Sequence, residues 1–146
     1  MPSTILAPVA QLVATAIANL AVTPSVKAYA TDPGLAGLDQ LPAAILGLPT
    51  IQRTEPDQAE LQIGAKDWNL QIPVLFVFDL GDTATAQTQA LDTIEKFIQA
   101  VDTGTLSQSD PLIVDAKVAQ SEPGELVDDA RPLLTYDCQL RLLRLN

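Results

Sequence analysis

The sequence predicts an α+β protein, in which one mainly antiparallel sheet has two helices packed on one face. Two segments, residues 4–21 and 83–104, carry apolar residues at helical spacing, whereas several others alternate between apolar and polar residues. Neighbouring alternating segments are close enough along the chain to pair as hairpins, which favours antiparallel strands. At 146 residues the chain has the length of one domain with a sizeable core, so we assign residues 1–146 to a single domain.

The composition argues against several classes of function. The net charge is −10, and the 8 Lys and Arg residues are scattered, so no basic face for a phosphate backbone is expected. The chain has no histidine, which removes His-based acid–base catalysis and His metal sites. With one cysteine, Cys138, no internal disulfide can form, as is typical of a reducing cytosol. Without a run of 18 apolar residues, we expect no association with a membrane.

Residues 4–21 predict an amphipathic helix that lies on the sheet. Its apolar residues recur at steps of three and four and form one stripe: Ile5, Val9, Leu12, Val13, Ala16, Ile17 and Leu20. Pro24 marks the end of this helix. A signal peptide is the alternative, but no basic residue precedes Lys27, which favours the helix. A helix that binds a partner protein is a further alternative.

Residues 25–30 alternate and predict a short strand, and the stretch 31–42, rich in Gly and Pro, predicts a loop. The loop contains Leu35, Leu38 and Leu41. These leucines either contact another chain or pack under their own domain. Residues 43–54 predict an extended segment interrupted by Gly47 and Pro49, of which Pro49 indicates an edge strand or a bulge.

The next segment contains the densest apolar run of the chain. Residues 61–72 predict a hairpin with its turn near Gly64–Asp67, in which Trp68 serves as a packing residue. Pro73 cannot donate a hydrogen bond, so we expect it at the start of a strand or on an edge. The run Val74–Phe78 is continuously apolar, which predicts burial on both faces of the sheet.

A helix follows this strand after a turn at Asp79–Asp82, with Asp82 or Thr83 as its N-cap. The stripe expected to be buried consists of Ala86, Ala90, Leu91, Ile94, Phe97, Ile98 and Val101. Asp92 and Lys96 are four residues apart on the solvent side and predict an ion pair. Gly104 predicts the end of the helix.

The last third of the chain predicts two strands. After a polar stretch, residues 111–120 alternate, with Leu112, Val114, Ala116 and Val118 on one face. Residues 121–131 predict a long acidic hairpin tip, and residues 132–145 predict the last strand. The residues of that strand that point inward are Leu134, Tyr136, Cys138, Leu140 and Leu142. Cys138 is therefore expected to be an inert packing residue.

The sharpest enzyme hypothesis is a metal-dependent nuclease. Pro56-Asp57 and the later Asp115-Ala116-Lys117 loosely resemble the Pro-Asp…Asp-x-Lys pattern, in which carboxylates hold Mg²⁺ beside a lysine. A strand and a helix separate the two halves, and the net charge of −10 opposes a DNA substrate. The acidic residues of 121–131 lack the spacing of a calcium loop. We therefore expect no enzymatic activity, no cofactor and no metal site.

The order of elements resembles the tail terminator and head–tail joining (neck) proteins of long-tailed bacteriophages. Those are small α+β proteins that open with an amphipathic helix, insert a second helix after a central strand, and finish on two strands joined by a long hairpin. The segments that carry the likeness are WNLQIPVLFVF (68–78), ALDTIEKFIQAV (90–101) and PLLTYDCQLRL (132–142). The resemblance covers nearly the whole chain as a pattern of elements, and no signature motif is matched residue by residue.

The resemblance implies a virion protein, assembled in the host cytoplasm, that forms a homo-oligomeric ring, usually a hexamer. Such a ring caps the tail tube protein and meets the head connector and other neck proteins, while DNA passes through its lumen without specific binding. Candidate interface residues lie in the three long loops expected at 31–42, 53–66 and 121–131: Leu35, Leu38, Leu41, Arg53, Glu55, Lys66, Glu122, Glu125, Asp128, Asp129 and Arg131.

Two other functions are compatible with the same residues. A different neck component, such as a tail-completion or head-closure protein, shares the expected architecture. An unrelated cytosolic binding module with an acidic surface belongs to a different class, and it would need neither a ring nor a virion.

Overall fold

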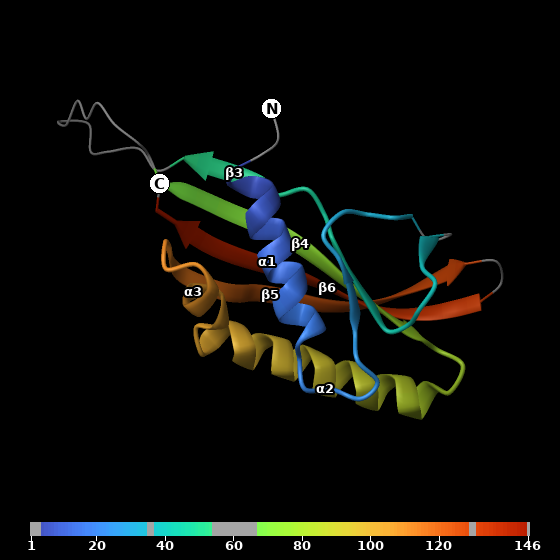
Figure 1. The fold of residues 1–146 in the computed structure, drawn as a ribbon. Coiled ribbons are helices and arrows are strands. Elements are labelled where there is room, and N and C mark those ends of the chain that lie inside the picture. The colour runs from blue at the N-terminus through green and yellow to red at the C-terminus, as the bar shows by residue number, and fades with distance from the viewer. Residues whose placement is uncertain (1–3, 35–36, 54–66, 129–130, 146) are drawn as a thin grey trace, which may run out of the picture.

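A computed structural model describes residues 4–34, 37–53, 67–128 and 131–145 of the chain. In this part of the chain, six strands form one sheet and three helices lie on one of its faces (Figure 1). The elements in chain order are α1 (Leu6–Ala18), β1 (Lys27–Tyr29), β2 (Ala43–Leu46), β3 (Thr50–Arg53), β4 (Trp68–Asp79), α2 (Thr83–Asp102), α3 (Thr105–Ser109), β5 (Ile113–Asp128) and β6 (Arg131–Arg144). The predicted α+β class is confirmed.

The sheet has the strand order β1-β2-β4-β6-β5. β3 pairs with the same edge of β4 as β2 does, but nearer the N-terminal end of β4. All pairs are antiparallel except β1 with β2, which is parallel. The central pair is β4 with β6, in register from Trp68 opposite Arg144 to Asp79 opposite Leu133. Two long antiparallel strands therefore form the middle of the sheet, with β1 and β3 at one edge and β5 at the other.

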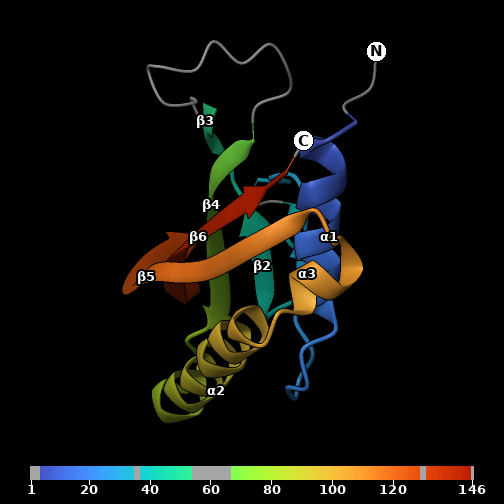
Figure 2. The ribbon, with the colours of Figure 1, turned by 90° about the vertical axis from the view of Figure 1, so that its left-hand side faces the viewer.

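The main core lies between the sheet and the helices, which cover the same face in both views (Figures 1 and 2). Residues buried in it come from α1 (Val9, Val13, Ile17), α2 (Ala90, Ile94, Phe97, Val101) and the inward positions of β4 (Leu70, Ile72, Val74, Phe76, Phe78). The Phe76 and Phe97 rings meet at a centroid distance of 5.2 Å. The apolar stripes of the two predicted helices thus form this core, as their spacing predicts.

The prediction of the buried α2 stripe is wrong at one residue, Leu91. Leu91 is 64% exposed, whereas Thr93 is buried with 2% exposure. Ala90 lies at the centre of the buried face. Successive helical residues are about 100° apart, so the Leu91 side chain points roughly a quarter turn away from that face. Thr93 lies three residues after Ala90 and four before Phe97, which places it on that face. Position on the helix, and not hydrophobicity alone, decides which side chain is buried.

A smaller core lies on the opposite face of the sheet, beneath the loop 31–42. Ile45, Val77 and Leu133 are buried there, and Leu38 and Leu41 pack against them. The run Val74–Phe78 is thus covered on both faces, as predicted. Of the two interpretations of the loop leucines, Leu38 and Leu41 follow the second and pack on their own domain, and Leu35 lies outside the described residues.

Pro73 lies in the middle of the central strand β4, so its predicted position at a strand start or an edge is wrong. It is paired with Gln139 of β6 on one side. On the other side it faces the interruption between β2 and β3, where the Gly47 amide donates to the Pro73 carbonyl at 2.8 Å. The N–H and C=O of one strand residue point to the same side, so the missing N–H of Pro73 also faces this interruption.

The hairpin predicted over residues 61–72 is replaced by a wider one. Trp68–Gln71 pairs with Thr50–Arg53 of β3 on one edge and with β6 on the other. The partner of β4 is thus a segment that lies before residue 54, and the predicted turn Gly64–Asp67 falls largely outside the described residues. Trp68 is partly buried against the main core, in agreement with its predicted packing role.

β5 differs from its prediction in two respects. Register shifts at Ile113/Asp115 and Val118/Gln120 mark two bulges, so the simple alternation predicted for 111–120 is wrong at its start. Ile113 is buried, whereas Val114 is 51% exposed. The strand also continues to Asp128, through residues predicted as a hairpin tip, because each of them pairs with β6. Cross-strand pairing overrides the turn-like composition of this segment.

The short helix α3 was not predicted, since its sequence TLSQS is polar. Gly104, with φ +84°, ends α2 as predicted and also serves as the N-cap of α3. The single apolar side chain of α3, Leu106, is buried. None of the described helices is both long and apolar enough to cross a membrane.

Candidate interaction surface

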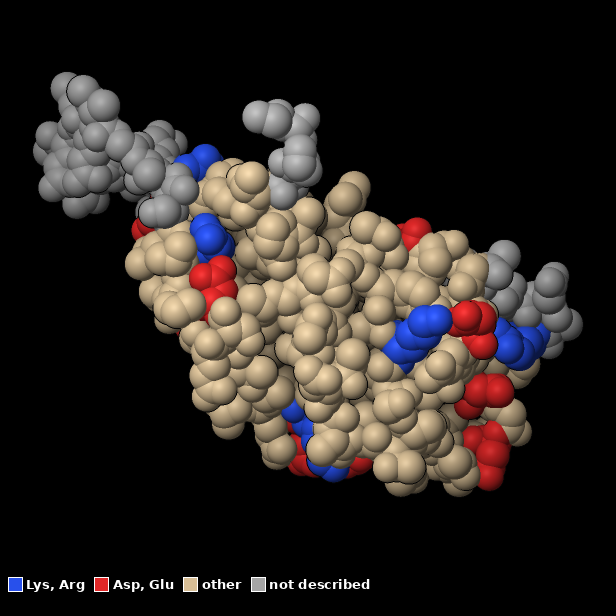
Figure 3. All heavy atoms as spheres, in the orientation of Figure 1, with Lys and Arg blue, Asp and Glu red and all other residues tan. Residues whose placement is uncertain are grey.

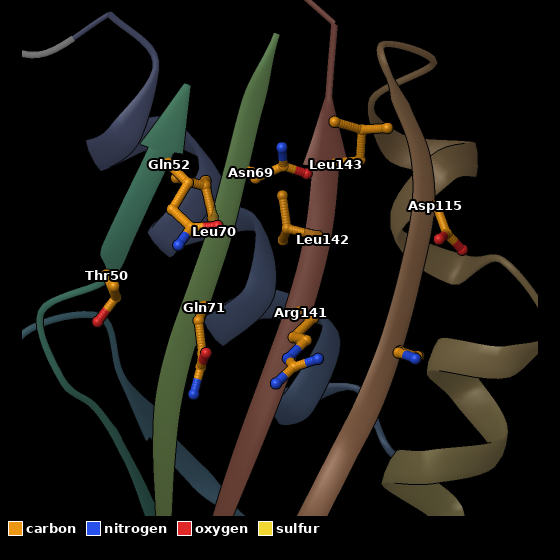
Figure 4. A pocket seen from close by; sticks show the side chains of 10 residues that line it. Thr50, Gln52, Asn69, Leu70, Gln71, Asp115, Arg141, Leu142 and Leu143 are labelled. Carbon is orange, nitrogen blue, oxygen red and sulfur yellow. The ribbon is translucent and has the colours of Figure 1, made fainter. Parts of the chain in front are cut away.

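The sheet face opposite the helices is polar where the loop 31–42 does not cover it. An open hollow of about 470 Å³ lies there, and Figure 4 shows the side chains around it. Its polar lining comes from β3 (Thr50, Gln52), β4 (Asn69, Gln71), β5 (Asp115, Lys117) and β6 (Arg141). Alternation explains this composition, because the residues between them on β4 and β6, such as Leu70 and Leu142, point into the main core.

The strand register brings two cations together on this face. Lys117 of β5 lies directly opposite Arg141 of β6. Both side chains are exposed, and both line the hollow. Within the described part of the chain, neither cation has an acidic partner within ion-pair distance. We call Lys117 and Arg141 the cationic row.

Further along the same hairpin, two acids lie opposite each other. Glu122 of β5 is paired with Asp137 of β6, and both are exposed. We call these two residues the acidic row. Two glutamines, Gln120 and Gln139, form the row between the two charged rows.

The glutamine row is joined to the acidic row by hydrogen bonds. The Gln120 Nε2 group donates to Glu122 Oε1, and the Gln139 Nε2 group donates to Asp137 Oδ1 at 3.4 Å. Gln139 Oε1 in turn accepts from Gln71 Nε2 at 3.0 Å. The outer face of the hairpin therefore carries a cationic, an amide and an acidic row in sequence, and the amides are oriented by their neighbours.

The helix-covered face has a different surface. Charged side chains are sparse on it and gather at the end where α2 begins and the β5–β6 hairpin closes (Figure 3). α1 contains no charged residue at all. On α2, Lys96 donates to Asp92 at 2.9 Å, which confirms the predicted pair, and Asp82 caps the helix by accepting from the Thr85 amide. Asp79 and Asp82 are thus turn and cap residues, as predicted.

The described residues include only the second half of the nuclease pattern, Asp115-Ala116-Lys117. Asp115 and Lys117 lie on the exposed face of β5, whereas Pro56 and Asp57 fall outside the described residues. Among the described residues, no group of three His, Cys, Asp or Glu side chains is placed to hold a metal ion. The structure therefore offers Asp115 no second carboxylate from the residues it describes.

The residues predicted as interface candidates are distributed over several places. Glu122 and Glu125 are exposed on β5, and Arg131 is exposed at the start of β6, opposite Asp128 in the register. Arg53 ends β3, with its guanidinium 4.0 Å from the centre of the Trp68 ring. Leu35, Glu55, Lys66 and Asp129 lie outside the described residues.

Three charged residues of the two rows were missed by the sequence prediction: Lys117, Asp137 and Arg141. Their outward direction follows from the alternation of each strand. Their partners do not, because the bulge at Val118/Gln120 shifts the register by one residue between the two rows.

Cys138 is buried on the inward face of β6, as predicted. Burial raises the pKa of its thiol to about 11, and the Ser121 hydroxyl, 3.3 Å from the sulfur, opposes this shift only in part. A thiol with such a high pKa is almost fully protonated at neutral pH, and the protonated form is a poor nucleophile. The structure therefore gives Cys138 a packing role.

Comparisons with known proteins give similar solved structures but no family. No protein family matches the sequence, and no curated protein is similar to it. Among solved structures, the chain is similar to one from a structure described as the virion of a native gene transfer agent (GTA) particle. The two share 16% identity with a TM-score of 0.49, over 99% of this chain and 100% of the other. At that identity and TM-score, the likeness carries no conclusion about function.

Proposed function

We propose that this protein is a structural virion protein of a long-tailed, phage-like particle. In this proposal it acts as a tail terminator, which caps the tail tube as a ring, usually of six copies, and joins it to the head connector. It has no enzymatic activity and no cofactor. It assembles in the host cytoplasm and remains in the tail or neck of the virion.

The observation that supports this proposal best is the order and pairing of the elements. The chain opens with α1 against the sheet, inserts α2 directly after the central strand β4, and finishes on a hairpin whose arms span 16 and 14 residues. This is the arrangement that the resemblance implies. The long hairpin and the loop 31–42 place most of the exposed charge away from the helices, on surfaces available to neighbours.

Deletion of the gene in the host that produces the particle tests this function. We expect free heads and tails of uncontrolled length in electron micrographs, since growth of the tube would no longer be stopped, and purified protein added to such an extract should restore joining. Tails of normal length beside heads that lose their DNA would instead identify a head-closure protein. Particles that assemble normally would reject a virion role and favour the acidic binding module.

A further inference from the structure

We propose that the outer face of the β5–β6 hairpin binds a second copy of this chain, with the cationic row of one copy against the acidic row of the other. This contact is additional to the ring of the proposed function, because a surface that docks on itself across a two-fold axis closes as a dimer and does not by itself build a ring. Four residues define this surface: Lys117 and Arg141 in the cationic row, and Glu122 and Asp137 in the acidic row.

The first argument is that each row is unfavourable in the isolated chain. Like charges directly opposite each other on one face of a sheet are destabilising. The hairpin contains two such pairs of opposite sign, and the Lys117 and Arg141 side chains have no acidic partner among the described residues. Contact with a second copy would place an opposite charge against each row and so offset both repulsions.

The second argument is the spacing of the rows. Asp137 and Arg141 are four residues apart on β6, which corresponds to about 13 Å along the strand. This separation is too large for the two rows of one chain to form ion pairs with each other. A second hairpin laid antiparallel across the first would bring each cationic row onto an acidic row, with the two amide rows at the centre.

The amide row suits this central position. A glutamine side chain both donates and accepts hydrogen bonds, so Gln120 and Gln139 can meet the same residues of another copy without leaving a group unpaired. Packed sheets keep their strand directions within about 30° of each other, which an antiparallel arrangement of two hairpins satisfies.

Apolar surface lies beside the charged rows. A second open hollow of about 380 Å³ borders the acidic row and is lined by Ile45, Pro73, Leu75 and Leu126 together with Asp137. Leu126, at the end of β5, is 37% exposed. The proposed contact thus has an apolar border beside its acidic row, while the charges select the partner.

The charge balance favours a copy of the chain over nucleic acid as the partner. The four residues of the two rows carry no net charge, Asp115 adds a further acid to the same face, and the whole chain carries −10. A phosphate backbone needs a continuous basic surface, which the acidic row interrupts. A surface with equal positive and negative rows is complementary to itself.

Charge reversal tests the proposal by sedimentation of the purified protein. Lys117→Glu with Arg141→Glu, and separately Glu122→Lys with Asp137→Lys, should each weaken self-association by about tenfold or more. An equimolar mixture of the two double variants should associate again, and so should the chain that carries all four changes. Lys96→Glu and Glu95→Lys on α2 are the matched controls and should leave association unchanged.

Each outcome separates the surface from the function. If the wild type associates and neither double variant differs from it, the hairpin face is not the interface, and the terminator function stands. If both variants fail but the mixture and the fourfold variant do not recover, the predicted pairing between rows is rejected. If the wild type remains monomeric at every concentration, self-docking is rejected, while the gene deletion still tests the virion role. Circular dichroism melting curves confirm that each variant is folded.

Discussion

Gly47 lies against the Pro73 ring, where a side chain has no room. A Cβ atom at position 47 would be 2.7 Å from Pro73 Cγ. The Gly47 amide also donates to the Pro73 carbonyl at 2.8 Å, so the backbone cannot move away without losing this bond. Because position 47 has no side chain, the Pro73 ring fits beside it within the central strand.

Replacement of Gly47 by alanine tests this close approach. We expect Gly47→Ala to lower the free energy of unfolding by about 1–3 kcal/mol, as overpacking of a tight contact does. Gly81→Ala is the control, because the nearest atom to its Cβ would be Asp79 Oδ1 at an ordinary 3.5 Å, and its effect should stay within about 0.5 kcal/mol. Equal midpoints for both variants in urea unfolding would show that the strand adjusts freely.

Cys138 gives a second prediction at this scale. Burial raises its thiol pKa above the ordinary 9.0 to about 11. The folded state therefore favours the neutral thiol, so this contribution to stability is present below pH 9 and is lost between about pH 9 and 11. Iodoacetamide at pH 8 should label the unfolded chain and leave the native chain unlabelled, as mass spectrometry would show. Labelling at similar rates in both states would contradict the burial.

In the loop 31–42, the carboxylate of Asp39 receives hydrogen bonds from two side chains of the sheet. Asp39 Oδ1 accepts from Lys27 Nζ and from Tyr29 Oη, each at 3.0 Å, and so ties the loop to the edge strand β1. Leu38 and Leu41, on either side of Asp39, can then cover the smaller core. Residues that form a loop by composition thus become a layer of the fold.

Asp39→Asn should loosen this loop. The bonds from Lys27 and then Tyr29 hold the pKa of Asp39 below its ordinary value of 3.8. Its contribution is therefore present above that pH and is lost as the pH falls below it. The protection of the amides of residues 37–41 against hydrogen exchange, relative to the intrinsic exchange rate at the same pH, should decrease in the variant at pH 7 and in the wild type at low pH.

Asp32→Asn is the control for this loop, because the Asp32 carboxylate accepts only from the nearby Gly34 amide, at 2.7 Å, among its described contacts. It should leave the exchange of the amides of residues 37–41 unchanged. Equal exchange in Asp39→Asn and the wild type would show that apolar contacts alone hold the loop.

At the scale of the whole molecule, the charge of −10 should prevent binding to DNA. We expect no mobility shift of duplex DNA at low salt and no cleavage in the presence of Mg²⁺. The same charge would let DNA pass along the lumen of a ring without adhering to it, as the proposed function requires. A salt-sensitive shift would point to a basic surface formed by assembly, and cleavage that is lost in Asp115→Ala would revive the nuclease hypothesis.

Much of the fold could be predicted from the sequence where one period dominates. The stripes of α1 and α2, the N-cap Asp82 and the alternation of β6 follow from local spacing, and the structure confirms them. The predictions were wrong where a contact distant in sequence decides the outcome. Residues 121–128 look like a turn but form a strand, because β6 supplies a partner for each of them.

The candidate surface shows the same division. Its residue types and outward directions can be read from alternation along β5 and β6. The opposition of Lys117 to Arg141, and of Glu122 to Asp137, depends on a bulge that adds one residue between the two pairs. A bulge is a property of two paired strands, so one strand alone does not predict it.

The sequence by itself determined the α+β class, both long helices, the buried run of β4 and the lack of histidine chemistry, because each depends on residues close together in the chain or on composition. The tertiary structure decided the partner of Trp68–Gln71, the place of Pro73 and the two charged rows of the hairpin. Those features depend on which strands pair and in what register. Pairing is set by the burial of a whole sheet face, to which segments from both ends of the chain contribute.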